Sequence, residues 1–259
     1  MSISSAMRRI WPRETVRVDR QRNLMLGRGY QKSLQYALNC GISPVTVYDV
    51  GAATGTPWLY SAFPDARHLL FEPLPAHVEV LRSKYADSDF EIHNTAIGSA
   101  RGSAKLHIPV GSGSKTTWSS LLEISDEMNA YDRQRGVKSE MIAVDVPLAM
   151  LDDFAQDGRC VMKVDVEGTE MDVLRGASHV LKTCDLLILE MSIYPRMAGE
   201  ARFADIIRHL DGLGFELFDI PAIFYPLSDC DLSFIDALFV PVADRRFGKW
   251  IKSSESSTL

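Results

Sequence analysis

The sequence predicts an α/β fold, with a mainly parallel sheet that carries helices on both faces. Three observations predict it. Short apolar runs rich in β-branched residues, such as residues 45–50, are typical of strands covered on both faces. Amphipathic helical patterns alternate with these runs, and glycines or acids follow several of them. The 259 residues, of which 46% are hydrophobic, are enough for the core of one such domain.

A helix is expected before the first strand, because Tyr30, Leu34 and Leu38 share one helical face and Gly41 is a stop signal. This covering helix and the basic arm before it make up residues 1–44. The main domain is expected over residues 45–245. The Ser-rich tail, residues 246–259, is expected to be disordered.

The first strand runs into a turn that reads Gly-Ala-Ala-Thr-Gly. Asp49 lies near the carboxyl end of the strand, and Gly51 and Gly55 let a ligand approach the backbone closely. In open α/β sheets this edge is where ligands bind. We therefore expect Asp49, Gly51 and Gly55 to contact a cofactor.

A second acid, Glu72, ends the next apolar run, at the spacing where such folds place a carboxylate on ribose hydroxyls. The two acids suggest a nucleoside site. A dinucleotide fold requires G-x-G-x-x-G, and this turn lacks the middle glycine. A cationic ligand without phosphates suits an acid at the strand end, which favours S-adenosylmethionine over NAD. Taken alone, a G-x-x-x-G turn is equally typical of an ordinary strand-to-helix connection.

The third strand, residues 90–93, leads into Asn-Thr-Ala-Ile-Gly. Asn94 is placed to lie near an adenine ring, although Asn and Gly are equally common in plain turns. An insert of about residues 104–146 follows, with strand-like ends and a loop rich in Gly, Ser and Thr. We expect this insert near the mouth of the pocket, where it would determine the choice of substrate.

The next strand, residues 160–166, again ends with acids. Glu170 and Asp172 suit the N-terminus of the following helix, where negative charge is stabilising. That role does not account for Asp165, which therefore marks a candidate functional site together with Glu167.

Composition excludes several functional classes. Residues 1–30 hold seven arginines against Glu14 and Asp19, so a net charge of −6 for the chain leaves −11 on the remainder. An acidic body disfavours a nucleic-acid partner, and the arm is interpreted as a solvated extension. No apolar run approaches the roughly 18 residues that cross a bilayer, so we expect no transmembrane segment and a cytoplasmic location. The cysteines and histidines show no zinc spacing.

Several short blocks, taken in order, are similar to those of the FkbM-type, S-adenosylmethionine-dependent methyltransferases. The blocks are Tyr-Asp-Val-Gly-Ala at 48–52, Phe-Glu-Pro at 71–73, Asn-Thr-Ala-Ile-Gly at 94–98, Leu-Asp-Asp-Phe at 151–154, Lys-Val-Asp-Val-Glu-Gly-Thr-Glu at 163–170, Val-Leu-Arg-Gly-Ala at 173–177 and Leu-Glu at 189–190. The resemblance implies a Rossmann-like class I methyltransferase fold, with a seven-stranded, mainly parallel sheet whose last strand is antiparallel. It also implies methyl transfer, usually to a hydroxyl oxygen of a sugar or natural product, and hence a small-molecule or glycan acceptor.

By this analogy, Asp49 would accept from the amino-acid portion of the cofactor, Glu72 would hold the ribose hydroxyls and Asn94 would lie near the adenine. One departure concerns the first turn, where the family usually carries Asn after Gly-Ala and this chain has Ala53. That difference removes one side-chain amide near the cofactor.

By the same analogy, Asp165 would orient the acceptor or act as its general base, with Glu167 second and Glu190 and His93 weaker candidates. Asp165 and Glu167 could instead share Mg²⁺. Residues two apart on a regular strand point to opposite faces, which argues against a shared ion unless the strand has already ended.

Two other functional classes stay open. A non-catalytic S-adenosylmethionine-binding protein is compatible with Ala53, and an NAD-dependent dehydrogenase is disfavoured by the missing glycine. No motif specifies the acceptor, the choice between O- and N-methylation, or the oligomeric state.

Overall fold

The computed structural model describes residues 24–26, 29–110, 116–134, 140–225 and 232–242, and the structural statements below concern these residues. All seven arginines of the basic arm, which lie in residues 1–23 and 27–28, and the predicted disordered tail, residues 246–259, lie outside them. None of the helices in the described part of the chain has the length and apolar character needed to cross a membrane.

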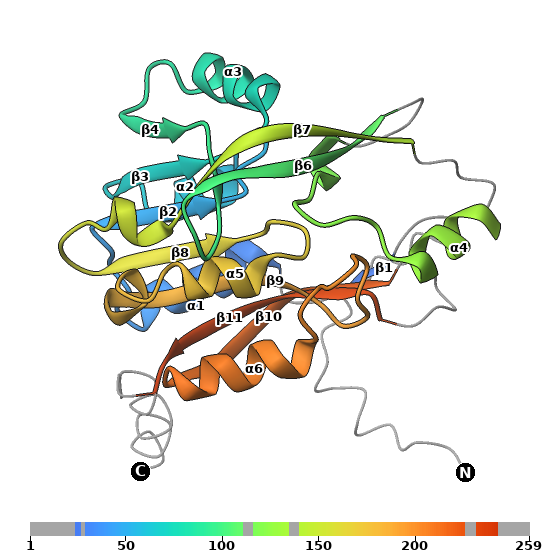
Figure 1. Ribbon diagram of the computed structural model, residues 1–259. Coiled ribbons are helices and arrows are strands. Elements are labelled where there is room, and N and C mark those ends of the chain that lie inside the picture. The colour runs from blue at the N-terminus through green and yellow to red at the C-terminus, as the bar shows by residue number, and fades with distance from the viewer. Residues whose placement is uncertain (1–23, 27–28, 111–115, 135–139, 226–231, 243–259) are drawn as a thin grey trace, which may run out of the picture.

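A central sheet of eight strands organises the chain (Figure 1). Its strands are β1 Leu24–Leu26, β2 Thr46–Val50, β3 Arg67–Phe71, β4 Phe90–His93, β8 Cys160–Val164, β9 Cys184–Ser192, β10 Phe215–Tyr225 and β11 Phe234–Pro241. Their order is β1-β10-β11-β9-β8-β2-β3-β4. The five neighbouring strands β9, β8, β2, β3 and β4 are parallel, and β11 is antiparallel to both of its neighbours, β9 and β10. The predicted seven-stranded, mainly parallel sheet is confirmed, and β1 extends it beside β10 as an eighth strand.

Helices cover both faces of this sheet. They are α1 Tyr30–Asn39, α2 Pro57–Ala62, α3 Pro75–Lys84, α5 Glu170–Arg175 and α6 Phe203–Gly212. One buried core joins α5 and α6 to one face, and a second joins α1, α2 and α3 to the other. In Figure 1, α5 and α6 lie in front of the sheet and α1 lies behind it. Successive residues of each strand alternate between the cores, because strand side chains point to opposite faces.

The central strands are covered completely, since all five residues of β2 and of β8 are buried. Burying a Val, Leu or Met side chain stabilises the fold by roughly 1.5 to 3 kcal/mol. The buried run of β8 nevertheless includes Lys163, and that of β2 includes Asp49. A buried charge requires a partner, so these two residues draw attention to the edge where the strands end.

The insert and the segment just before it form a second sheet of three strands, in the order β5-β7-β6. Its elements are β5 Ala96–Ile97, β6 Gly102–Val110, the short 3-10 helix η2 Thr116–Trp118, α4 Asp126–Gln134 and β7 Glu140–Ala149. β6 and β7 pair antiparallel from Gly102↔Leu148 to Val110↔Glu140, and they correspond to the strand-like ends expected there. Two further 3-10 helices, η3 Leu151–Phe154 and η4 Val180–Thr183, flank β8.

Candidate active site

A cavity opens where β2, β3 and β8 end, between the central sheet and the insert. Four of the predicted site residues line it: Gly51, Glu72, Asp165 and Glu167. The other three are not among its lining residues: Asp49, Gly55 and Asn94. Glu190, a weaker candidate, also lines the cavity, whereas His93 does not and instead stacks on Phe71.

The turn after β2 brings two strand ends together. Gly51 has a φ of +76°, and a Cβ placed on it would lie 1.8 Å from the carbonyl oxygen of Asp165. Glycine is therefore required by the backbone conformation and by the space. Gly55 has a φ of +103°, and a Cβ there would lie 2.5 Å from the Tyr85 hydroxyl. Gly55 thus packs against the end of α3, and only Gly51 faces the cavity.

Ala53 connects this turn to Glu72. It has a φ of +46°, in the left-handed region that residues with a Cβ adopt infrequently. Its N–H donates a hydrogen bond of 2.9 Å to Oε2 of Glu72. The turn after β2 and the acid after β3 are therefore held as one unit.

Glu72 is buried and held on several sides. Its Oε1 accepts the N–H of Leu74 at 2.9 Å and lies 3.4 Å from Nδ1 of His77. The other ring nitrogen of His77 lies 2.9 Å from Oγ1 of Thr116, in the insert. A carboxylate has about four acceptor positions, so Glu72 keeps capacity for further hydroxyl donors. No sequence motif singled out His77.

Asn94 fixes the backbone that carries Glu72. Its Nδ2 donates to the carbonyl oxygens of Glu72 at 3.0 Å and Pro73 at 2.9 Å. The amide is therefore committed to the backbone that carries Glu72. The residues that follow it, Thr95, Ala96 and Ile97, line the cavity in its place.

Asp49 lies on the other face of the sheet edge and is fully buried. Its Oδ2 accepts a hydrogen bond of 2.5 Å from the Tyr60 hydroxyl, and its Oδ1 lies 3.2 Å from Nζ of Lys163. Lys163 also donates to the carbonyl oxygen of Gly51 at 2.8 Å and lies 3.3 Å from Oδ2 of Asp165. Burial opposes the charge of Lys163, but Asp165 and Asp49 outweigh it and raise the pKa of the ammonium above its ordinary value. The sequence signal that could have predicted this pairing is the single lysine, Lys163, in an otherwise apolar strand.

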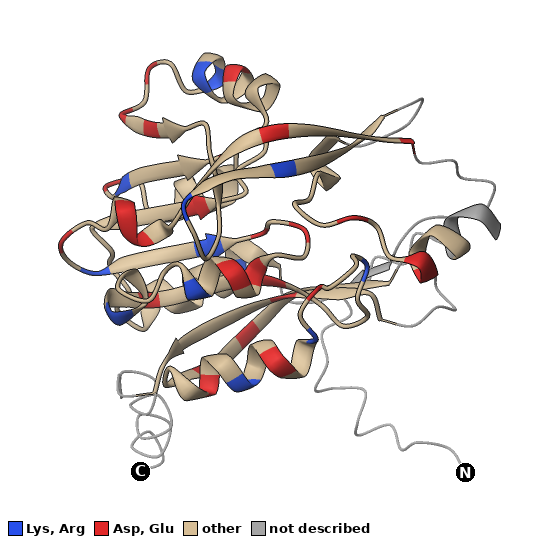
Figure 2. Ribbon diagram, in the orientation of Figure 1, with Lys and Arg blue, Asp and Glu red and all other residues tan. Residues whose placement is uncertain are grey.

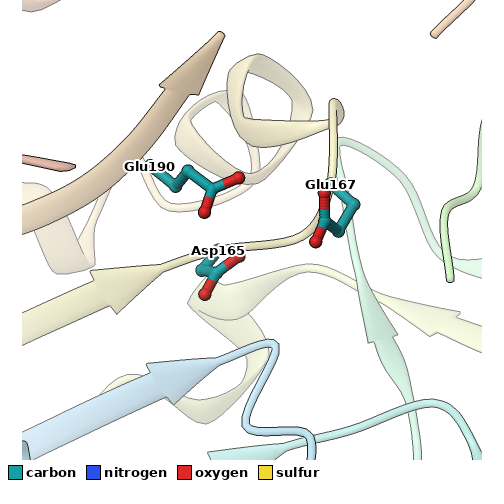
Figure 3. A group of neighbouring side chains, drawn as sticks. All are labelled: Asp165, Glu167 and Glu190. Carbon is teal, nitrogen blue, oxygen red and sulfur yellow. The ribbon is translucent and has the colours of Figure 1, made fainter. Parts of the chain in front are cut away.

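Asp165, Glu167 and Glu190 form a carboxylate cluster, in which one oxygen from each lies within 4.8 Å of the others. Figure 3 shows Asp165 and Glu167 on the loop after β8 and Glu190 on the neighbouring strand β9. The expectation that Asp165 and Glu167 diverge does not apply, because β8 ends at Val164. Glu167 has a φ of +57°, which turns the chain back toward Asp165. Figure 2 shows further acidic residues along this edge.

The members of the carboxylate cluster differ in exposure and protonation. The Asp165 side chain is 35% exposed, against 10% for Glu167. Burial, opposed by Arg196 and reinforced by Asp165, raises the pKa of Glu167 to about 8. Burial, followed by repulsion from Asp165 and Glu167, raises the pKa of Glu190 well above its ordinary value. Asp165 is therefore the most accessible member to a molecule in the cavity.

Arg196 lies in the loop between β9 and α6 and contacts two members of the carboxylate cluster. Its Nη2 lies 2.8 Å from Oε1 of Glu190, and its Nη1 lies 3.2 Å from Oε2 of Glu167. Its Nε donates to Oγ of Ser192 at 3.0 Å. Strain, burial and shifted pKa values gathered in one cavity are typical of functional sites. Sequence reasoning missed Arg196, which lies in no recognised block.

The cavity suits a particular chemistry. Its acidic lining residues are Glu72, Asp165, Glu167 and Glu190, and none of its described lining residues is Lys or Arg. Such a lining favours a ligand that donates hydrogen bonds or carries positive charge. A carboxylate next to the bound molecule can also accept a proton.

Comparisons with known proteins identify one family model and several solved structures that the chain is similar to. A family model described as the methyltransferase FkbM domain matches residues 49–217. Solved structures that match include magnesium protoporphyrin IX methyltransferase (ChlM) from Synechocystis PCC 6803 with bound SAM, at 12% identity and a TM-score of 0.43, covering 82% of this chain and 77% of that one. An rRNA methylase from Streptococcus thermophilus matches at 9% identity and a TM-score of 0.43, covering 82% and 95%. No curated protein sequence matches the chain.

Proposed function

The chain belongs to the FkbM methyltransferase family, and we propose that it transfers the methyl group of S-adenosylmethionine to a hydroxyl oxygen of a small molecule, sugar or natural product. The observation that supports this most is the meeting of Gly51, Glu72 and Asp165 around one cavity. They come from the ends of three strands, and open α/β sheets bind their ligands at this edge.

The residues present fit the cofactor. A Cβ at Gly51 would collide with the Asp165 carbonyl oxygen, so glycine lets the ends of β2 and β8 come together and leaves the turn beside the cavity without a side chain. Glu72 would accept the two ribose hydroxyls with the acceptor positions that the backbone N–H groups leave free. Asp49 would act indirectly, because it holds Lys163 and, through it, the Gly51 carbonyl. Asn94 would act indirectly as well, by fixing the backbone of Glu72.

Asp165 is the proposed general base. When bound, S-adenosylmethionine supplies an electrophilic methyl carbon on a sulfonium. Asp165 would accept the proton of the acceptor hydroxyl at a carboxylate oxygen, as that oxygen takes up the methyl group and the thioether of the cofactor leaves. Asp165 suits this task because it is the most exposed member of the carboxylate cluster and has no arginine partner among the described ion pairs. Glu167 and Glu190 would orient the acceptor.

The insert would select the acceptor. Thr116, Thr117, Trp118 and Ser119 line the cavity, and Trp118 is half-exposed at its rim. An aromatic face beside carboxylates suits a neutral molecule that carries hydroxyl groups. Phosphate-rich acceptors such as nucleic acids would be disfavoured by the acidic lining.

Calorimetric titration with S-adenosylhomocysteine tests the cofactor site. We expect micromolar binding to the wild type, and no binding of NAD. Glu72→Ala should weaken binding by about tenfold or more, or roughly 1.4 kcal/mol, because the ribose hydroxyls lose their acceptor. Glu79→Ala, at an exposed position on α3, is the matched control and should leave the affinity unchanged. Binding of NAD in place of S-adenosylhomocysteine would indicate a dehydrogenase.

Turnover is a separate measurement. The protein is incubated with S-adenosylmethionine and a panel of hydroxyl and amine acceptors, and release of S-adenosylhomocysteine is measured. The proposal expects release with a hydroxyl acceptor and its loss in Asp165→Asn, which should keep its affinity for S-adenosylhomocysteine. Tight cofactor binding without turnover across the panel would support the non-catalytic alternative.

A further inference from the structure

The three side chains of the carboxylate cluster repel one another when they are ionised, so the fold needs a positive charge beside them. Three carboxyl groups lie with oxygens within 4.8 Å of one another, at a partly buried site. Like charges at that distance repel strongly where water is scarce. Hard divalent cations bind such groups, so a cation at the centre of the cluster would be one solution.

Arg196 supplies a different solution. Its guanidinium places one nitrogen 2.8 Å from Glu190 and another 3.2 Å from Glu167, so that one cation serves two carboxylates. The side chain is 14% exposed, and its guanidinium carbon lies 4.9 Å from the ring centre of Phe234. A planar guanidinium fits two carboxylates and an aromatic face in a way that a lysine does not.

The backbone of Arg196 is fixed independently of these contacts. Its N–H donates to Oε2 of Glu200 at 2.6 Å, and its carbonyl oxygen accepts the N–H of Ser125, in the insert, at 3.0 Å. The N–H of Met197 donates to the same Glu200 oxygen at 3.0 Å. The loop is therefore built to present Arg196 at one position beside the carboxylate cluster.

Asp165 is compensated from the other side. Lys163 lies 3.3 Å from Asp165, and no ion pair between Arg196 and Asp165 is present among the described residues. The two buried cations thus divide the carboxylate cluster between them. Glu167 and Glu190 are held by Arg196, and Asp165 keeps its exposure to the cavity.

We propose that Arg196 is the positioning residue of the acceptor side of this site. Its guanidinium takes the place that a divalent cation would otherwise take in the carboxylate cluster, holds Glu167 and Glu190, and leaves Asp165 to meet the acceptor. The last part rests on the proposed function, whereas the exclusion of a cation does not. Methyl transfer would then proceed without Mg²⁺.

Binding of Mn²⁺, measured by calorimetry and electron paramagnetic resonance, tests this inference without a known acceptor. The wild type should show no saturable site. Arg196→Met should bind one Mn²⁺ at least about tenfold more tightly than the wild type, because the freed carboxylates become ligands. Arg196→Met with Glu190→Gln should lose that site again. Arg202→Met is the matched control, since Arg202 is exposed and pairs with Asp205 at the start of α6.

Several outcomes would overturn the inference. Wild-type protein that binds Mn²⁺ as tightly as Arg196→Met would show that the arginine does not take the place of a cation. Folded Arg196→Met without a Mn²⁺ site would show the same. If Arg196→Met does not fold, Mn²⁺ should restore its folding, as it should for Arg196→Gln, and failure of both contradicts the proposal. S-adenosylhomocysteine affinity, measured on each variant, reports separately on the cofactor site.

Discussion

The ammonium of Lys163 donates a hydrogen bond of 2.8 Å to the carbonyl oxygen of Gly51. Through this contact, a buried charge of β8 holds the glycine turn of β2. The same ammonium lies 3.2 Å from Asp49 and 3.3 Å from Asp165, so one cation fixes both strand ends. The predicted cofactor turn and the predicted base thus share a single support.

Lys163→Met should lower the free energy of unfolding by about 3 to 5 kcal/mol, because it leaves the fully buried Asp49 without its cation. Urea denaturation measures the change. Adding Asp49→Asn should recover much of the loss, since it removes the uncompensated charge. Lys105→Met is the control, because Lys105 makes an exposed pair with Asp145 that contributes about 0 to 1 kcal/mol. A loss no larger than that of the control would contradict the role given to Lys163.

Gly51→Ala and Gly41→Ala separate close approach from backbone strain. Both glycines have a positive φ, but a Cβ at Gly51 would lie 1.8 Å from the Asp165 carbonyl oxygen, whereas one at Gly41 meets nothing within 4 Å. Gly41→Ala should cost about 1 to 2 kcal/mol of stability and leave S-adenosylhomocysteine binding intact. Gly51→Ala should cost more and weaken binding by about tenfold or more. Thermal melts and calorimetry measure both effects, and equal results for the two variants would argue against the close approach.

Ala53→Asn should stabilise the protein by about 0.5 to 1 kcal/mol, because Asn adopts the left-handed conformation at φ +46° more readily than Ala. Chemical denaturation checks the direction. The same substitution at Ala130, inside α4, should instead destabilise by a few tenths of a kcal/mol, since Asn is a poorer helix former than Ala. A loss of stability in Ala53→Asn would mean that the turn needs the smaller side chain.

Glu170→Gln should change how stability depends on pH. Burial raises the pKa of Glu170 from its ordinary value of 4.5 to about 7, against the N–H of Gly168, which donates to Oε1 at 3.0 Å. Between pH 4.5 and 7 the folded state therefore holds a proton that the unfolded state has lost, so the wild type loses stability as the pH rises.

The variant has no such group, so its stability relative to the wild type should grow by roughly 1.4 kcal/mol per pH unit within that window. Below and above the window the difference should be constant. Denaturation of both proteins from pH 4 to 8 measures it, and parallel curves would show that Glu170 keeps its ordinary pKa in the fold. Glu79→Gln, at an exposed position on α3, serves as the control.

Local sequence patterns determined the strands of the central sheet apart from β1, and the positions of Glu72 and Asp165 after β3 and β8. A strand and the turn that ends it are encoded by a few consecutive residues, and parallel strands place their carboxyl ends at one edge of the sheet. The same logic identified Gly51, because a glycine after such a strand permits close approach. It placed Asp49 near the end of the first strand, but it could not tell that the side chain lies on the face of the sheet away from the cavity.

The side chains that contact the predicted site residues could be found only in the tertiary structure. Arg196 and His77 belong to no motif, and their contacts with Glu190 and Thr116 join segments that are distant in the sequence. The return of Glu167 toward Asp165 follows from a φ of +57° that local propensity does not predict for Glu.

The sequence by itself thus determined the family, the sheet and the edge at which the candidate site lies, because these depend on short-range patterns of burial and glycine. The tertiary structure alone decided how the charges at that edge are paired. Lys163 and Arg196 acquire their partners only when β2, β8, β9 and the loop after β9 come together. Electrostatic energies depend on distances of a few ångströms and on burial, and neither is specified by the order of residues along the chain.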